Sequence, residues 1–158
     1  MNVTENTSRR SAVKSLFTTI AAAGASLFGM AHAKPAEAAP ITHVPDESQQ
    51  GAQAPLFSGS VTHNGLVYVA GKGEHGPGDI TAHTVSVLNQ IEAELKKAGS
   101  SMDKVLKVNV YLTDINNFAG MNKAYIGRFG GDPPVRTTVA VTAIPDGTLV
   151  EIDCIAHR

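Results

Sequence analysis

The sequence predicts an α+β fold in which two helices cover one face of a mostly antiparallel sheet. β-branched residues alternate with other side chains in five short segments, which is typical of strands. Apolar residues recur at helical spacing in two longer segments. Turn-forming runs such as Asn64-Gly65 and Pro145-Asp146-Gly147 separate the segments, and the predicted order is β-β-α-β-α-β-β.

The first two predicted strands span residues 57–62 and 66–70. They join at His63-Asn64-Gly65, because an Asn-Gly pair favours a tight hairpin turn. A glycine-rich loop over residues 71–78 follows, and Asp79 is the expected N-cap of a helix that ends at Gly99. The buried face of this helix is predicted to carry Ile80, Val85, Leu88, Ile91, Leu95 and Ala98.

A third strand is predicted over residues 105–112, and a second helix over residues 115–129. The second helix is expected to bury Ile115, Phe118, Tyr125, Ile126 and Phe129. A break at residues 130–134, which contains Pro133 and Pro134, then leads into a strand over residues 135–141. The side chains expected to line a contact with another subunit are Tyr111, Thr138, Ala140 and Thr142.

The last strand is predicted to begin at Leu149, after a turn at residues 145–148, and if it pairs with the strand before it this turn fixes the register. In that register Thr142 lies opposite Glu151, and Arg136 is about 20 Å from Glu151 along the ladder. Arg136 and Glu151 could not then share one small ligand within a single chain. Either the two strands do not pair directly, or a neighbouring chain brings these residues together.

The N-terminus carries the pattern of an export signal over residues 1–33. Ser8-Arg9-Arg10 forms a twin-arginine motif, a short apolar run follows, and Ala31-His32-Ala33 fits a cleavage site. The apolar run is too short to span a membrane as a helix. We therefore expect export to the periplasm by the twin-arginine pathway and a mature chain that begins at Lys34, with no membrane association after signal removal.

Residues 34–55 contain four of the eight prolines and are predicted to be a linker, in which only residues 41–44 form a short strand. Residues 56–158 are the predicted domain. Without residues 1–33 the chain has ten basic and thirteen acidic side chains and no basic cluster, so nucleic-acid binding is not expected. Cys154 is the only cysteine, which excludes an internal disulfide, and its place on a strand predicts a buried thiol.

Arg136 and Glu151 are the side chains best suited to chemistry. An arginine fork holds a planar carboxylate through two parallel hydrogen bonds. A glutamate between Val150 and Ile152 can exchange protons with water if its surroundings raise its pKa. A structural ion pair between strands is the alternative for these two residues.

Several spaced segments resemble the reactive-intermediate deaminase family, RidA, whose members are also called YjgF-like. They are Pro134-Val135-Arg136-Thr137 and Val150-Glu151-Ile152, together with residues 65–71, 105–112 and 121–125. The resemblance implies the chorismate-mutase-like fold and a homotrimer with ligand sites in the clefts between subunits. It also implies hydrolysis of 2-imino acids to 2-keto acids and ammonia, without a metal or an organic cofactor.

The same resemblance assigns a role to each candidate residue. Arg136 would bind the substrate carboxylate, and Glu151 would position the water that attacks the imine carbon. Gly71 would bring its backbone close to the substrate, and Thr138, which stands where many members have cysteine, would act through backbone groups. Asn122 and Tyr125 occupy positions near the cleft.

Three departures from the family pattern affect the predicted cleft. Leu56 follows Pro55 where active members often have tyrosine, Ala70 stands where they have serine, and Lys72 stands where they have glutamine. Lys72 is therefore expected to add positive charge to the cleft. These departures favour a binding protein or chaperone-like trimer that turns nothing over, whereas the presence of Glu151 favours an enzyme.

Two other sites are not expected. Residues 71–76 fit the pattern G-x-G-x-x-G, but Asp79 places the helix start after the third glycine, which argues against dinucleotide binding. Four histidines show no metal-binding spacing and are expected to be solvated: His63, His75, His83 and His157.

Overall fold

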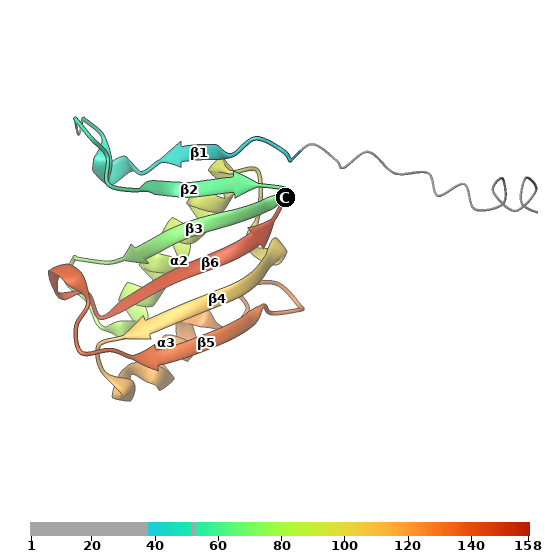
Figure 1. Cartoon of the computed structure of the whole chain (residues 1–158). Coiled ribbons are helices and arrows are strands. Elements are labelled where there is room, and N and C mark those ends of the chain that lie inside the picture. Colours follow the sequence, from blue (N-terminus) through green and yellow to red (C-terminus); the bar gives the residue numbers. More distant parts are fainter. Residues whose placement is uncertain (1–37, 52) are drawn as a thin grey trace, which may run out of the picture. The chain divides into compact units, whose positions relative to one another are not determined.

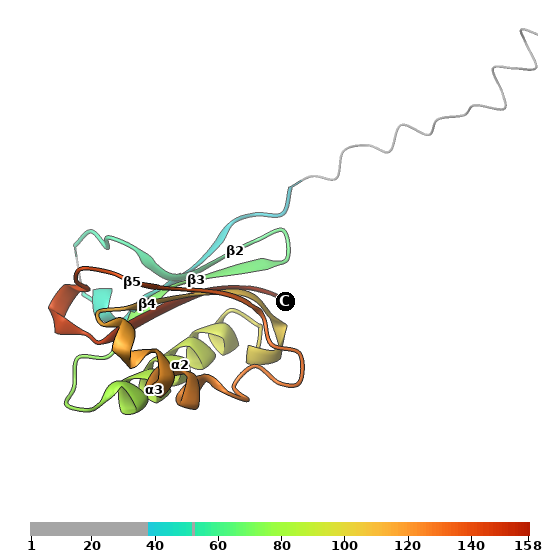
Figure 2. The same ribbon diagram turned by 90° about the horizontal axis from the view of Figure 1, so that it is seen from below.

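The computed structural model describes residues 38–51 and 53–158, which form a six-stranded sheet with two α-helices on one face (Figures 1 and 2). The order of the strands across the sheet is β1-β2-β3-β6-β4-β5. The elements are β1 (Thr42–Pro45), β2 (Ser58–His63), β3 (Leu66–Gly73), α2 (Ile80–Lys97), β4 (Val105–Leu112), α3 (Phe118–Tyr125), β5 (Val135–Ala140) and β6 (Val150–His157). The predicted α+β class is confirmed. The predicted export signal lies outside the described residues.

The N-terminal hairpin is built as its turn residues predict. Asn64 and Gly65 both have positive φ, 49° and 78°, which is the conformation of a tight hairpin turn, and β2 pairs antiparallel with β3. Strand β1 pairs with β2 at the edge of the sheet, so the short strand expected near residues 41–44 is present. The compact unit therefore begins at Ala38, well before the predicted domain start at residue 56.

The last two strands do not pair directly, which is the first of the two alternatives that the sequence leaves open. Strand β4 lies between them: it pairs parallel with β5 and antiparallel with β6. Helix α3 forms the crossover that a parallel pair requires, and Figure 2 shows it on the same face as α2. Thr142 therefore does not lie opposite Glu151, and the short 3-10 turn at Pro145–Gly147 connects two strands that are not neighbours.

Both predicted helices are present, but one buried position of the first and the end of the second differ from the prediction. Asp79 accepts a hydrogen bond from the Ala82 N–H at 2.8 Å and caps α2, as predicted. Val85 is exposed, and Val87 takes its place in the core. Helix α3 ends at Tyr125, before the predicted end at residue 129, since the chain turns at Gly127 and Gly130, both with positive φ.

The core fills the space between the sheet and the two helices. Of the residues assigned to the buried face of the second helix, Tyr125 and Phe129 are buried and Ile115, Phe118 and Ile126 are exposed. The other face of the sheet, called the open face here, has no helix over it (Figure 2). Among the described helices, none is both long enough and apolar enough to cross a membrane.

Candidate active site

Arg136 and Glu151 lie on opposite faces of the sheet. Arg136 is level with Val108 of β4, whose side chain is buried in the core, so the arginine points toward the helices. Glu151 alternates with the buried Val150 and Ile152 and points to the open face. In the observed register three residues separate their levels, or about 10 Å along the strands, and β4 lies between them.

This arrangement rules out the structural alternative of an ion pair between Arg136 and Glu151 within one chain. It divides the predicted site into two parts. The arginine half-site contains Arg136, Asn122, Tyr125 and Thr138 on the helix-covered face. The glutamate half-site contains Glu151 and Gly71, with Tyr111 of the neighbouring strand, on the open face.

Aromatic side chains hold the Arg136 guanidinium in the arginine half-site. Its central carbon lies 4.5 Å from the centre of the Tyr125 ring and 5.7 Å from that of Phe118. One guanidinium nitrogen also contacts the Met121 sulfur at 4.0 Å. Within residues 38–51 and 53–158, no carboxylate forms an ion pair with Arg136. The guanidinium is therefore positioned and still has donors available for an anionic ligand.

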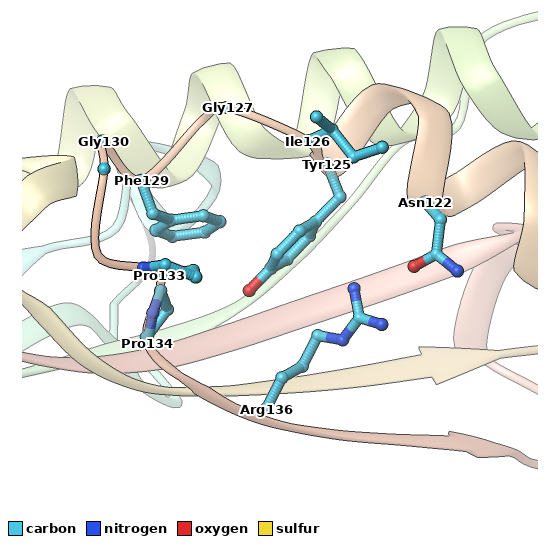
Figure 3. Close-up of a pocket in the computed structure, with 10 residues that line it drawn as sticks. Asn122, Tyr125, Ile126, Gly127, Phe129, Gly130, Pro133, Pro134 and Arg136 are labelled. Atoms are coloured by element: carbon cyan, nitrogen blue, oxygen red, sulfur yellow. The ribbon is translucent and has the colours of Figure 1, made fainter.

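A cavity of about 590 Å³ opens beside Arg136 (Figure 3). Asn122 and Tyr125 line it from α3, and Pro133 and Pro134 line it from the segment before β5. The Tyr125 hydroxyl is buried and has no hydrogen-bond partner. Burial raises the pKa of Tyr125 to about 12 although Arg136 acts in the opposite direction, so the phenol is a neutral donor near pH 7.

Thr138 follows Arg136 on the same face of β5, and its hydroxyl is buried without a partner. Thr138 and Ala140, two of the residues expected at a subunit contact, lie level with buried residues of β4 on the helix-covered face. Tyr111 does lie on the open face. Burial and the nearby carboxylates Asp153 and Glu151 raise the pKa of its phenol.

Close packing defines the glutamate half-site. A side-chain carbon added to Gly71 would lie 2.2 Å from Glu151 Oε1, so only glycine leaves room for the carboxylate in this position. The β3–β6 ladder skips a residue here: Val69 pairs with Cys154 and Lys72 with Ile152, so that Ala70 and Gly71 together face one residue of β6. This β-bulge brings the Gly71 backbone beside Glu151.

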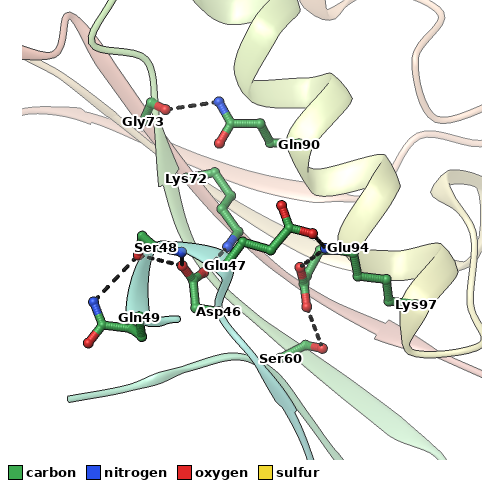
Figure 4. Close-up of polar contacts among 10 residues, drawn as sticks. All are labelled: Asp46, Glu47, Ser48, Gln49, Ser60, Lys72, Gly73, Gln90, Glu94 and Lys97. Atoms are coloured by element: carbon green, nitrogen blue, oxygen red, sulfur yellow. Dashed lines mark hydrogen bonds and ion pairs between the residues drawn. The ribbon is translucent and has the colours of Figure 1, made fainter. Parts of the chain in front are cut away.

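The bulge also removes Lys72 from the glutamate half-site, which corrects the prediction that it adds charge to the cleft. Lys72 points to the other face and forms an ion pair with Asp46 at 2.5 Å (Figure 4). Burial opposes ionisation of Asp46, but hydrogen bonds from Lys72 and Ser48 outweigh it and lower its pKa to about 2. Lys72 thus attaches the segment after β1 to the sheet.

Other titratable groups stay outside both half-sites. Burial raises the pKa of the Cys154 thiol to about 12, which agrees with the expected buried and unreactive cysteine. His83, expected to be solvated, is buried on α2. In the described part of the chain, His, Cys, Asp and Glu side chains do not gather in groups of three or more that could hold a metal ion.

Residue-by-residue reasoning missed several side chains of the two half-sites. Phe118 and Met121 contact Arg136, and Phe129 lines the cavity with the two prolines. The aromatic residues were assigned only to the core, because helical periodicity does not distinguish a core position from the wall of a cavity. The bulge at Gly71 leaves one signal, a glycine within a strand pattern.

Comparison with known proteins gives a consistent result for the folded unit. A sequence profile of the family described as Endoribonuclease L-PSP matches residues 48–158. A RutC family protein of Pyrococcus abyssi is 38% identical over 109 residues, which cover 65% of this chain and 86% of that protein.

Solved structures with the same fold come from several bacteria. A member of the YjgF/YER057c/UK114 family from Mycobacterium tuberculosis superposes with a TM-score of 0.67 at 32% identity, over 75% of this chain and 100% of that one. RidA from the Antarctic bacterium Psychrobacter sp. gives a TM-score of 0.63 at 30% identity, over 73% of this chain and 94% of that one.

Proposed function

The chain belongs to the Endoribonuclease L-PSP family, to which the RutC, YjgF and RidA proteins are related, and we propose that it hydrolyses 2-imino acids to 2-keto acids and ammonia. The observation that carries the proposal is the Arg136 guanidinium, seated on two aromatic rings with no carboxylate partner among the described residues. Such a group takes the carboxylate of a small acid as its natural ligand.

Arg136 and Glu151 have separate tasks in this reaction. Arg136 binds the substrate carboxylate and fixes the position of the neighbouring imine carbon. Glu151 orients a water molecule and accepts a proton as the water oxygen attacks that carbon. The resulting carbinolamine loses ammonia when a proton returns to the nitrogen, and a keto group remains. An imine carbon is already electrophilic, so hydrolysis requires only binding, positioning and proton transfer.

The position of the two half-sites supports assembly of the site from two copies of the chain. Because Arg136 and Glu151 point to opposite faces, one substrate can contact both only if one copy supplies the arginine and another supplies the glutamate. A ring of three copies provides such contacts in a closed arrangement, with the same heterologous interface repeated. The open face, with exposed Tyr68, Val135 and Val139, is the surface that such an assembly would cover.

A binding protein without catalysis is the second candidate. Ala70 and Leu56 supply no hydroxyl groups, and Leu56 is 87% exposed. A chain that retains Arg136 but cannot activate water would bind 2-keto acids or other small carboxylates and release them unchanged. The acidic composition after residue 33 gives no support for ribonuclease activity, although some related structures carry that name.

Export to the periplasm remains a proposal that rests on the twin-arginine pattern at residues 8–10. A periplasmic location implies that the imino acids are formed there, by oxidation or dehydrogenation of amino acids.

The proposed activity is tested by producing a 2-imino acid in place with an amino-acid oxidase and measuring how fast it disappears, by trapping what remains with semicarbazide. Wild-type protein is expected to accelerate the loss. Glu151→Gln retains shape and hydrogen bonding without the proton acceptor, so kcat should fall on the order of a hundredfold while keto-acid binding persists. Binding of keto acids without any acceleration by wild-type protein would refute the enzyme and favour the binding protein.

A further inference from the structure

The cavity beside Arg136 is much larger than the carboxylate that Arg136 would hold. Its volume is about 590 Å³, within the range of pockets that bind small molecules, and a carboxylate with a methyl group would leave most of it to water. The wall beyond the guanidinium is formed by one chain, mainly by Ile126, Phe129, Pro133 and Pro134. The cavity thus has one cationic end and an apolar remainder.

The charged group lies at one end of the cavity. Asn122 and the face of the Tyr125 ring lie beside the Arg136 guanidinium, the Tyr125 hydroxyl points toward the two prolines, and Phe129 and the prolines form the opposite end (Figure 3). The guanidinium has no carboxylate partner among the described residues and therefore indicates a ligand whose anionic group binds at the Arg136 end.

Three glycines contribute only backbone to the wall of the cavity. Gly127, Gly130 and Gly131 line it without side chains, and a carbon added to Gly127 or Gly131 would meet no atom within 4 Å. Ile126 lies at the wall and is 78% exposed, so the cavity is reached from solvent past an apolar residue that contributes little to the core.

We infer that this cavity receives the side chain of the substrate, and that the preferred substrates are 2-imino acids with bulky apolar side chains, aromatic or branched. The inference rests on the proposed function, because it assumes that Arg136 holds the substrate carboxylate. The apolar wall then contacts the substrate's side chain, and the affinity for the substrate rises with each methylene group of that side chain that leaves water. Small imino acids leave the wall in contact with water and bind more weakly.

The test compares three 2-keto acids by calorimetry: pyruvate, 4-methyl-2-oxopentanoate and phenylpyruvate. A methylene in an apolar pocket changes selectivity by at least about tenfold, so both larger acids should bind more than ten times as tightly as pyruvate. The imines formed from alanine, leucine and phenylalanine by an oxidase should follow the same order in kcat/KM. Equal affinity for all three keto acids overturns the inference and leaves the proposed hydrolysis intact.

A variant locates the effect in the cavity. Ile126→Ser removes apolar surface at the entrance, and since the side chain is exposed, folding should be unaffected. It should lower affinity for phenylpyruvate at least threefold and leave affinity for pyruvate unchanged. Ile115→Ser is the matched control, because Ile115 is also exposed, at 57%, and does not line the cavity. An equal loss for both acids with Ile126→Ser, or the same selective loss with Ile115→Ser, overturns the inference.

Two further results separate this inference from the proposed function. If the larger keto acids bind selectively but no imine is hydrolysed, the side-chain cavity is upheld and the enzyme is refuted. If the imines from alanine, leucine and phenylalanine are hydrolysed with equal kcat/KM, the enzyme is upheld and the side-chain cavity is overturned.

Discussion

Gly71→Ala tests the geometry of the glutamate half-site most sharply. The added carbon would lie 2.2 Å from Glu151 Oε1 and 2.8 Å from its carboxyl carbon, whereas ordinary contacts begin at 3.4 Å. The carboxylate must therefore move by about 1.2 Å, and misplacement of a catalytic group by about 1 Å can cost a hundredfold in rate. We expect kcat for imine hydrolysis to fall roughly a hundredfold.

Binding and stability should change far less than kcat. The Glu151 side chain can swing away at small cost, and the keto-acid carboxylate is held by Arg136 of the other copy, so keto-acid affinity should stay within about twofold of the wild-type value. Gly73→Ala is the matched control, because a carbon added there comes no closer than 3.2 Å to the Thr148 side chain and does not meet Glu151. The assay is the trapped-imine measurement with calorimetry in parallel. Wild-type kcat in a folded Gly71→Ala protein would refute a role for Glu151 at this position.

Three further predictions concern stability and export. Asp46→Asn removes a carboxylate whose pKa is about 2 instead of 3.8, so the free energy of unfolding measured by urea titration should fall by about 2 kcal/mol at pH 7. Because the folded pKa is the lower one, this stabilisation is present above pH 3.8 and disappears as the pH falls through 2; an equal difference at pH 7 and pH 2 would contradict it. Thr148→Val removes a buried hydroxyl that donates to the Glu74 carbonyl at 2.7 Å and accepts from the Glu74 N–H at 2.9 Å, and should cost about 1–3 kcal/mol in the same titration. Replacement of Arg9 and Arg10 by lysine should keep full-length protein in the cytoplasm, whereas wild-type protein in the periplasm should have the mass of a chain that begins at Lys34; export of the double variant would refute the twin-arginine route.

Local signals were sufficient for most of the fold. The Asn64-Gly65 turn, the Asp79 cap and the alternation in β4 from Val108 to Leu112 each depend on neighbours in sequence, and the structure confirms all three. Whether β5 and β6 pair stayed open in the sequence, because strand order is set by contacts far apart in sequence. The run Pro145-Asp146-Gly147 looks like a hairpin turn whichever strand lies next to β6. The helix between β4 and β5 does indicate that these two strands are parallel neighbours, because parallel strands are usually joined by a crossover helix.

In the candidate site, too, some features could be predicted from the sequence and others depend on contacts between distant segments. The resemblance singled out Gly71 and Glu151, and the structure places them in contact; it also groups Asn122 and Tyr125 with Arg136. Their roles stay predictions. The bulge that turns Lys72 away from Glu151 could not be predicted from the alternation of apolar and polar residues. One extra residue in a strand moves the side chains after it to the opposite face of the sheet. The cavity beside Arg136 depends on the loop after α3, whose path no periodicity describes.

The central claim is that imine hydrolysis takes place where Arg136 of one copy meets Glu151 of another. It is tested by mixing two inactive variants, Arg136→Lys and Glu151→Gln, through co-expression with different tags and purification of the mixed assembly. A ring of three that contains both variants places an intact arginine beside an intact glutamate at one interface in three, so hydrolysis should recover to about a third of the wild-type rate. If the mixed assembly forms and its activity stays at the level of the separate variants, sites shared between copies are contradicted.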